Sequence, residues 1–215
     1  LFEGMKNGKI RFINEVTRAG KNKEVEAMKV AEKLSADSEI WAGFIKDFNE
    51  TGPEKISIRA ICKIIQPLYQ KVNDSNKSDE IKSDTAVYEI VEAFWKGFKS
   101  AYPEMFDINS ISQYNVLKAG PAEIMMKVLL KIFMLKSSGA AIGDIKDSAV
   151  FKRLLKSVLD KTIDTNPLGD KVSGAKLFLI GKKGSMGKYS NNAAKNDMAK
   201  VINERLFEHL NLPIA

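Results

Sequence analysis

Apolar residues recur at intervals of three and four along most of this 215-residue chain, a period that predicts helices rather than strands. The most apolar stripe covers residues 121–135, where Glu123, Lys127 and Lys131 form a single polar row. Pro121 suits the first turn of such a helix, because its missing amide would have no helical partner there. Residues 121–135 therefore predict the central core helix.

The same spacing predicts further helices over residues 25–34, 40–48, 58–66, 84–98, 111–117, 148–158 and 192–210. The candidate N-caps are Ser38, Ser57, Asp84 and either Asp147 or Ser148. Pro67 should kink or end its helix. Residues 176–180 are short, apolar and bounded by glycines, which predicts a strand.

Together these segments predict a mainly α fold, a multi-helix orthogonal bundle with a short strand or hairpin near residues 174–183. We expect one mainly helical domain over residues 1–215, with a polar loop at 73–83 and a basic strand-loop-helix at 171–212. A chain of this length buries a sizeable core. Cys62 lies on an apolar helix face and should be core filler.

The net charge of +7 is confined to the last third of the chain. Residues 121–215 hold 16 Lys and Arg against 9 Asp and Glu, whereas the first 120 residues are balanced. Residues 171–188 carry five lysines and no acid. Such a basic segment raises the local concentration of polyanions, so it predicts a nucleic-acid partner.

The stretch LFLIGKKGSMGKYSNN, residues 177–192, is the candidate site. Glycines let backbone amides converge on an anion, and a following helix offers its positive end. Hydroxyl and ammonium groups of this loop, and cations on the outer face of the 148–158 helix, could also bind the anion. The predicted phosphate-binding residues are Lys176, Lys182, Lys183, Gly184, Ser185, Gly187, Lys188, Tyr189, Lys152, Arg153 and Lys156.

This loop does not match the nucleotide-binding pattern G-x-x-x-x-G-K-[ST]. Lys182 stands where the pattern needs glycine, and Tyr189 stands where it needs serine or threonine. The alternative interpretation is a basic turn with nothing bound.

Other chemistry is scarce in the sequence. One cysteine and one histidine, His209, are too few for a zinc site or a Ser-His-Asp arrangement. We predict no catalytic residue, no metal and no cofactor. A reducing, cytoplasmic location fits the single cysteine, and no apolar run approaches the ~20 residues of a membrane span.

The succession of several segments resembles the C-terminal part of DGQHR-domain proteins, the group that includes the DNA-phosphorothioation regulator DndB. The matching segments are RFINEV with Phe12, Ile13 and Asn14, AEKLSADSEIWAGFI, ISIRAICKIIQPLY, YEIVEAFWKGFKSAYPEMF, YNVLKAGPAEIMMKVLL and the tail GKKGSMGKYSNNAAKNDMAKVI. The pentapeptide that names the family is absent from this chain. The resemblance implies that the signature-bearing half lies upstream of Leu1, and it implies a setting of DNA modification and phage defence.

Three functions stay open from the sequence. The favoured one is a regulatory or accessory module that binds DNA phosphates through the basic loop and takes its specificity from a partner protein or upstream domain. The second is a fragment of a phosphate- or nucleotide-handling enzyme. The third is a structural domain for protein–protein interaction, whose basic tail contributes only solubility.

Overall fold

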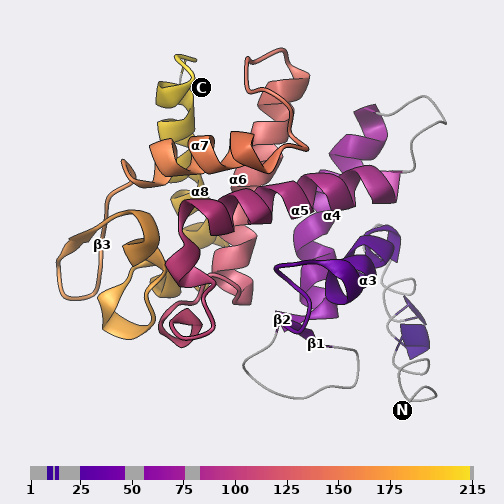
Figure 1. Cartoon of the computed structure of the whole chain (residues 1–215), viewed down its shortest axis with the longest axis horizontal. Coiled ribbons are helices and arrows are strands. Elements are labelled where there is room, and N and C mark those ends of the chain that lie inside the picture. Colours follow the sequence, from indigo (N-terminus) through magenta and orange to yellow (C-terminus); the bar gives the residue numbers. More distant parts are fainter. Residues whose placement is uncertain (1–8, 12, 15–24, 47–55, 76–82, 214–215) are drawn as a thin grey trace. The chain divides into compact units, whose positions relative to one another are not determined.

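Helices dominate the computed structural model, which describes residues 9–11, 13–14, 25–46, 56–75 and 83–213 (Figure 1). The α-helices are α3 (Met28–Asp37), α4 (Ile58–Ser75), α5 (Ser83–Ala101), α6 (Ala119–Ser137), α7 (Ser148–Leu159) and α8 (Asn192–His209). Short 3-10 helices are η1 (Pro103–Met105), η2 (Ile111–Gln113), η3 (Gly174–Phe178), η4 (Gly181–Lys183) and η5 (Met186–Lys188). The predicted mainly α fold is confirmed.

In the described part of the chain, two pairs of two-residue strands accompany the helices. Strands β1 (Ile45–Lys46) and β2 (Ile56–Ser57) pair in parallel, with Ile45 opposite Ile56. Strands β3 (Asp164–Thr165) and β4 (Lys171–Val172) pair antiparallel as a small hairpin, with Asp164 opposite Val172.

The chain packs into two compact units, which we describe separately: unit 1 covers residues 1–92 and unit 2 covers residues 93–215. The border lies within α5. The prediction of one domain over the whole chain stays a prediction.

In unit 1 the apolar faces of α3 and α4 pack together. Leu34 of α3 and Ile61 and Ile65 of α4 are each at most 2% exposed. Cys62 is fully buried on the same face of α4, as predicted, and forms no disulfide.

Ser38 caps the turn that follows α3. Its hydroxyl oxygen accepts hydrogen bonds from the amides of Ile40 (3.1 Å) and Trp41 (3.0 Å), so Ser38 caps a turn and not the helix for which it was predicted. The hydroxyl also donates to Glu92 Oε2 (2.6 Å), and Glu92 is only 7% exposed. The predicted helix over 40–48 is wrong, because after this turn the chain extends into β1; residues 47 and 48 lie outside the described residues.

Pro67 was predicted to kink or end its helix, and since α4 continues through it to Ser75, an end at Pro67 is wrong. The proline removes one amide donor, but buried residues on both sides of it, Ile65 and Leu68, keep the helix packed. Ser57 accepts the Ala60 amide (3.2 Å) at the start of α4, as predicted. Since α4 runs to Ser75 and α5 starts at Ser83, both ends of the predicted 73–83 loop are helical, and residues 76–82 lie outside the described part.

An aromatic cluster forms the core of unit 2. Phe98 lies at its centre, with ring centroids 5.4 Å from Phe178 and 5.9 Å from both Tyr102 and Phe106. Phe94 reaches Phe151 of α7 at 5.3 Å in an edge-on geometry that aromatic rings favour. These contacts join α5, α7 and η3.

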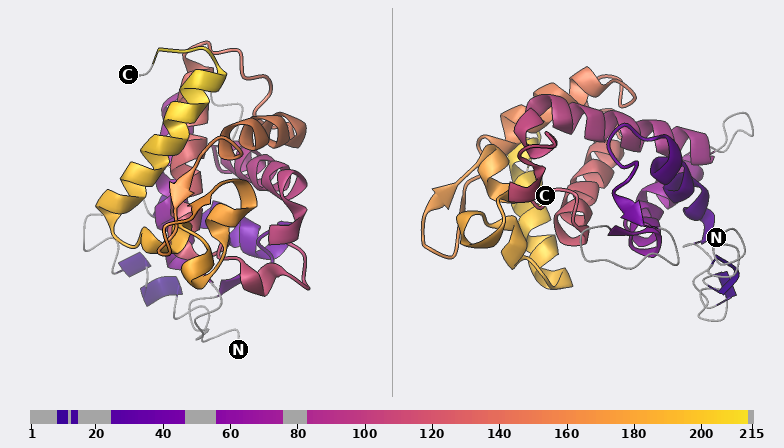
Figure 2. Two further views of the ribbon diagram at one scale, coloured as in Figure 1. Left: turned by 90° about the vertical axis from the view of Figure 1, so that its left-hand side faces the viewer. Right: turned by 60° about the horizontal axis from the view of Figure 1, so that its bottom comes forward.

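Helices α6 and α8 lie side by side in unit 2 (Figures 1 and 2). Pro121 falls in the first turn of α6, and Ile124, Leu129 and Ile132 are fully buried, so residues 121–135 do form the predicted core helix. Asp147 caps α7 by accepting the Ala149 amide (2.8 Å), and Asn191 caps α8 by accepting the Ala194 amide (2.8 Å).

The predicted strand over residues 176–180 is wrong, because residues 174–178 form η3. Leu177 and Phe178 are both fully buried, and two consecutive residues of a strand would point to opposite faces. The hairpin of this region lies slightly earlier, at β3 and β4. Leu179 contributes only an isolated bridge to Tyr114.

We expect Gly97→Ala to destabilise the protein by about 1–3 kcal/mol, the usual cost of overpacking a core. A Cβ at Gly97 would lie 2.6 Å from Phe151 Cβ and 2.6 Å from the Ser148 carbonyl oxygen, where α5 crosses α7. Urea unfolding followed by circular dichroism measures the change.

Gly120→Ala is the matched control, since its Cβ would meet only the Tyr189 carbonyl oxygen, at 3.7 Å. This variant should be neutral or slightly stabilising, because alanine favours helix. Equal destabilisation by both substitutions would contradict the close crossing at Gly97.

Candidate functional site

The predicted basic loop is a pair of 3-10 turns, η4 and η5, rather than a loop between strand and helix. The segment before it is held by residues 113–115: the Asn115 amide donates to the Phe178 carbonyl (2.9 Å), and the Ile180 amide donates to the Gln113 carbonyl (2.8 Å). The loop therefore starts from a fixed position.

The middle of the loop is buried. Ser185 and Met186 have no exposed surface, and the Ser185 amide donates to the Leu177 carbonyl (3.1 Å). A Cβ at Gly184 would lie 2.3 Å from the Leu179 carbonyl oxygen, so this glycine is required for packing. Ser185 thus faces the core, where its hydroxyl cannot donate to an anion in solvent.

Three of the predicted amide donors, those of Ser185, Lys188 and Tyr189, are engaged by the protein itself. The amides of Lys188 and Tyr189 donate to the carbonyls of Ser185 (3.0 Å) and Met186 (3.4 Å). In the first turn of α8, the Ala194 amide donates to the side chain of the cap residue, Asn191. The predicted convergence of these amides on an anion has no support in this geometry.

Lys188 and Tyr189 both bind Asp164 of β3. The Lys188 ammonium donates to Asp164 Oδ1 (2.9 Å) and to the Thr165 carbonyl (2.6 Å), and the Tyr189 hydroxyl donates to Asp164 Oδ2 (2.6 Å). This Asp164 brace joins the β3–β4 hairpin to the end of the loop. The sequence did not reveal it, because Asp164 lies 24 residues from Lys188.

Burial, hydrogen bonds and charges in the brace shift the pKa values of Asp164 and Tyr189. Burial alone would raise the pKa of Asp164, but the hydrogen bonds from Tyr189, Lys188 and the Thr165 amide, together with the Lys188 charge, hold it below its ordinary value. Burial and the hydrogen bond to Asp164 raise the pKa of Tyr189 well above its ordinary value. Tyr189 therefore stays protonated as a donor at neutral pH.

The other predicted cations lie on the surface. Lys176 on η3, Lys182 and Lys183 on η4, and Lys152 and Arg153 on α7 are exposed and form no ion pair within the described residues. Lys156 differs, because its ammonium lies 3.7 Å from Asp160 Oδ2 and over the Tyr102 ring. Gly187 is exposed at the loop surface.

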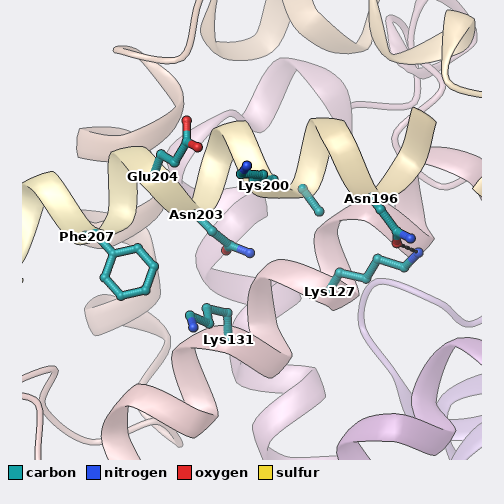
Figure 3. A pocket seen from close by; sticks show the side chains of 8 residues that line it. Lys127, Lys131, Asn196, Lys200, Asn203, Glu204 and Phe207 are labelled. Atoms are coloured by element: carbon teal, nitrogen blue, oxygen red, sulfur yellow. Dashed lines mark hydrogen bonds between the residues drawn. The ribbon is translucent and has the colours of Figure 1, made fainter. Parts of the chain in front are cut away.

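A groove that the sequence did not predict lies between α6 and α8 (Figure 3). Its volume is about 400 Å³, and its wall includes Lys127 and Lys131 of α6 and Asn196, Lys200, Asn203 and Phe207 of α8. The polar row at 123, 127 and 131 was visible in the sequence. The matching row on α8, at 196, 200 and 203, has the same helical spacing, but only the packing of the two helices shows that the rows face each other.

No group of three or more histidine, cysteine or acidic residues in the described segments could hold a metal ion. Within those segments, no helix has both the length and the apolar character to cross a membrane. No family model, curated protein or solved structure matches this chain. The resemblance to DGQHR-domain proteins stays a prediction.

Replacement of Asp164 by asparagine should lower the free energy of unfolding at pH 7 by about 1–3 kcal/mol, the range for losing charge-assisted hydrogen bonds. Because the folded-state pKa of Asp164 is lowered, its stabilisation is present above the ordinary aspartate pKa of about 3.9 and is lost as the pH falls through the folded-state value. The difference between wild type and Asp164→Asn should therefore shrink below about pH 4.

Denaturant titrations from neutral to acidic pH measure this difference. Asp74→Asn is the control, since Asp74 is exposed and forms no hydrogen bond or ion pair with described residues. A difference for Asp164→Asn that grew on acidification would contradict the assigned sign.

Proposed function

We propose that unit 2 is a DNA-binding accessory module that holds backbone phosphates with exposed lysines and arginine, in the setting of a DNA-modification or defence system. The supporting observation is the separation of charge between the units. Residues 93–215 carry 19 Lys and Arg against 11 Asp and Glu, whereas residues 1–92 carry 15 against 16. The whole positive excess thus lies in unit 2, where it attracts polyanions.

The contacts fall to the cations that lack an acidic partner in the described structure. Among the residues predicted from the sequence, those that meet this condition are Lys152 and Arg153 on α7, Lys176 on η3, and Lys182 and Lys183 on η4. Ammonium groups that are not neutralised by carboxylates release counterions from DNA when they bind its phosphates. They position the duplex without reading bases, so specificity would come from a partner protein or another domain.

Lys188 and Tyr189 have a different role in this proposal. Both side chains bind Asp164, so they hold the loop in place and contribute little charge to the DNA surface. The proposal is therefore narrower than the one from the sequence alone, and Ser185 and the loop amides have no part in it.

We expect duplex DNA to bind with an affinity that falls steeply with salt. The triple variant Lys176→Ala, Lys182→Ala, Lys183→Ala should reduce the log–log salt slope by about 2.7, at roughly 0.9 for each lost phosphate contact. Fluorescence anisotropy with a labelled duplex at several salt concentrations measures the slope.

The matched control removes three exposed lysines from unit 1, Lys29, Lys63 and Lys71, with the same change in net charge. This control should leave the salt slope unchanged. Lys188→Ala should lower the free energy of unfolding and leave the salt slope nearly unchanged, because the Lys188 ammonium is paired with Asp164. Salt-independent binding, or equal loss in both triple variants, would refute the proposal. Unchanged DNA affinity in the unit 2 variant would favour a protein-interaction domain instead.

A further inference from the structure

A network of ion pairs and hydrogen bonds joins α6 to α8 at the Lys127 end of the groove. Glu123 of α6 accepts from Lys127 on its own helix (3.0 Å) and from Lys195 of α8 (2.5 Å), and Lys127 also donates to Asn196 Oδ1 (2.7 Å). Burial alone would raise the pKa of Glu123, but these two lysines lower it. Glu123 is therefore a charged residue of α6 that links this helix to α8 through Lys195.

The groove itself carries an excess of positive charge. Lys131 and Lys200 form no ion pair within the described residues, and Lys127 shares its only carboxylate partner, Glu123, with Lys195. The Lys131 ammonium lies 4.7 Å from the centroid of the Phe207 ring, where it has no carboxylate. Glu204 is the acidic residue of the lining, and Figure 3 shows its carboxylate directed away from Lys127 and Lys131.

An acceptor in the wall also lacks a partner. Asn203 Oδ1 is buried and accepts no hydrogen bond in the described structure. A buried acceptor without a donor costs free energy, which a donor from a ligand would recover. Figure 3 shows the Asn203 amide nitrogen extending from α8 while the oxygen lies beside that helix. The terminal torsion of asparagine is broad and roughly two-fold, so a flip of the amide would present the oxygen to the groove.

We propose that this groove binds a phosphate monoester whose organic part carries a hydroxyl or N–H donor. Lys131 of α6 and Lys200 of α8 hold the phosphate oxygens, and Asn203 Oδ1 accepts from the organic part once its amide has turned toward the groove. A volume of about 400 Å³ exceeds the needs of a lone phosphate and falls in the range of small-molecule sites. Phe207 supplies the apolar end of the wall.

Two sources could supply this chemistry: a small phosphorylated molecule, or the 5′-phosphate end of a nucleic acid. The site is separate from the lysines assigned to duplex DNA above, and the inference does not rest on that proposal. If the groove binds no phosphate monoester, the predicted salt dependence of duplex DNA binding is unaffected.

Isothermal titration with adenosine 5′-monophosphate and with glucose 6-phosphate tests the first source, with adenosine and glucose as the unphosphorylated controls. Anisotropy with a short single strand bearing either a 5′-phosphate or a 5′-hydroxyl tests the second. Saturable binding of a phosphate monoester, or tighter binding of the 5′-phosphorylated strand, supports the site. The arm that responds identifies the source.

Each of Lys131→Ala and Lys200→Ala should weaken this phosphate-dependent binding by roughly tenfold. Asn203→Asp, which is nearly isosteric, should abolish it by placing a carboxylate beside the phosphate. The control is the double variant Lys136→Ala, Lys161→Ala, which removes two exposed lysines of unit 2 outside the groove and should bind normally.

Thermal unfolding of each variant verifies that it folds. The proposal is overturned if no phosphate monoester binds and the 5′-phosphate has no effect. It is overturned equally if binding persists in folded Lys131→Ala, Lys200→Ala and Asn203→Asp proteins, or if the control double variant loses it to the same extent.

Discussion

The ion pairs of Glu123 with Lys127 and Lys195 determine what unit 2 can present between α6 and α8. This carboxylate is held by one lysine from each helix, so it joins α6 to α8 at this point. The lysines and asparagines one or two turns further along then face each other across a gap instead of closing it. The groove runs from this paired end to Phe207, over whose ring the Lys131 ammonium lies.

A second constraint concerns the basic loop, where folding and ligand binding compete for the same groups. The amides of Ser185 and Tyr189 and the Tyr189 hydroxyl donate to other groups of unit 2, so they do not donate to an anion. A buried polar group must find a partner, and here the protein supplies most of those partners itself. The charges that stay available are therefore those on flexible, exposed side chains, which suit a mobile polyanion better than a small bound ion.

The sequence predicted the helices well where periodicity was strong. The cores of α6 and α8, the caps Ser57 and Asp147, and the burial of Cys62 follow from local spacing and cap chemistry alone. The errors lie where tertiary packing overrides local preference. Residues 174–178 form a 3-10 turn because Leu177 and Phe178 must both face the core, and α4 continues past Pro67 because buried residues flank it.

The candidate site was predictable only in part, for a similar reason. A run of lysines without acids is visible in any sequence, but the partner of Lys188 is Asp164, in a hairpin that the local pattern did not predict. The two polar rows of the groove are likewise visible one at a time. That the two rows face each other depends on the packing of α6 against α8, and the sequence of one helix does not predict this packing.

The burial of the single cysteine has a practical consequence for measuring the dynamics of this protein. Cys62 is the only thiol in the chain and is fully buried in unit 1. A thiol reagent can reach it only when that part of the chain opens, so the labelling rate under native conditions reports every opening that exposes Cys62, local or global. Labelling of Cys62 faster than global unfolding would therefore show that unit 1 opens locally while the rest of the protein stays folded.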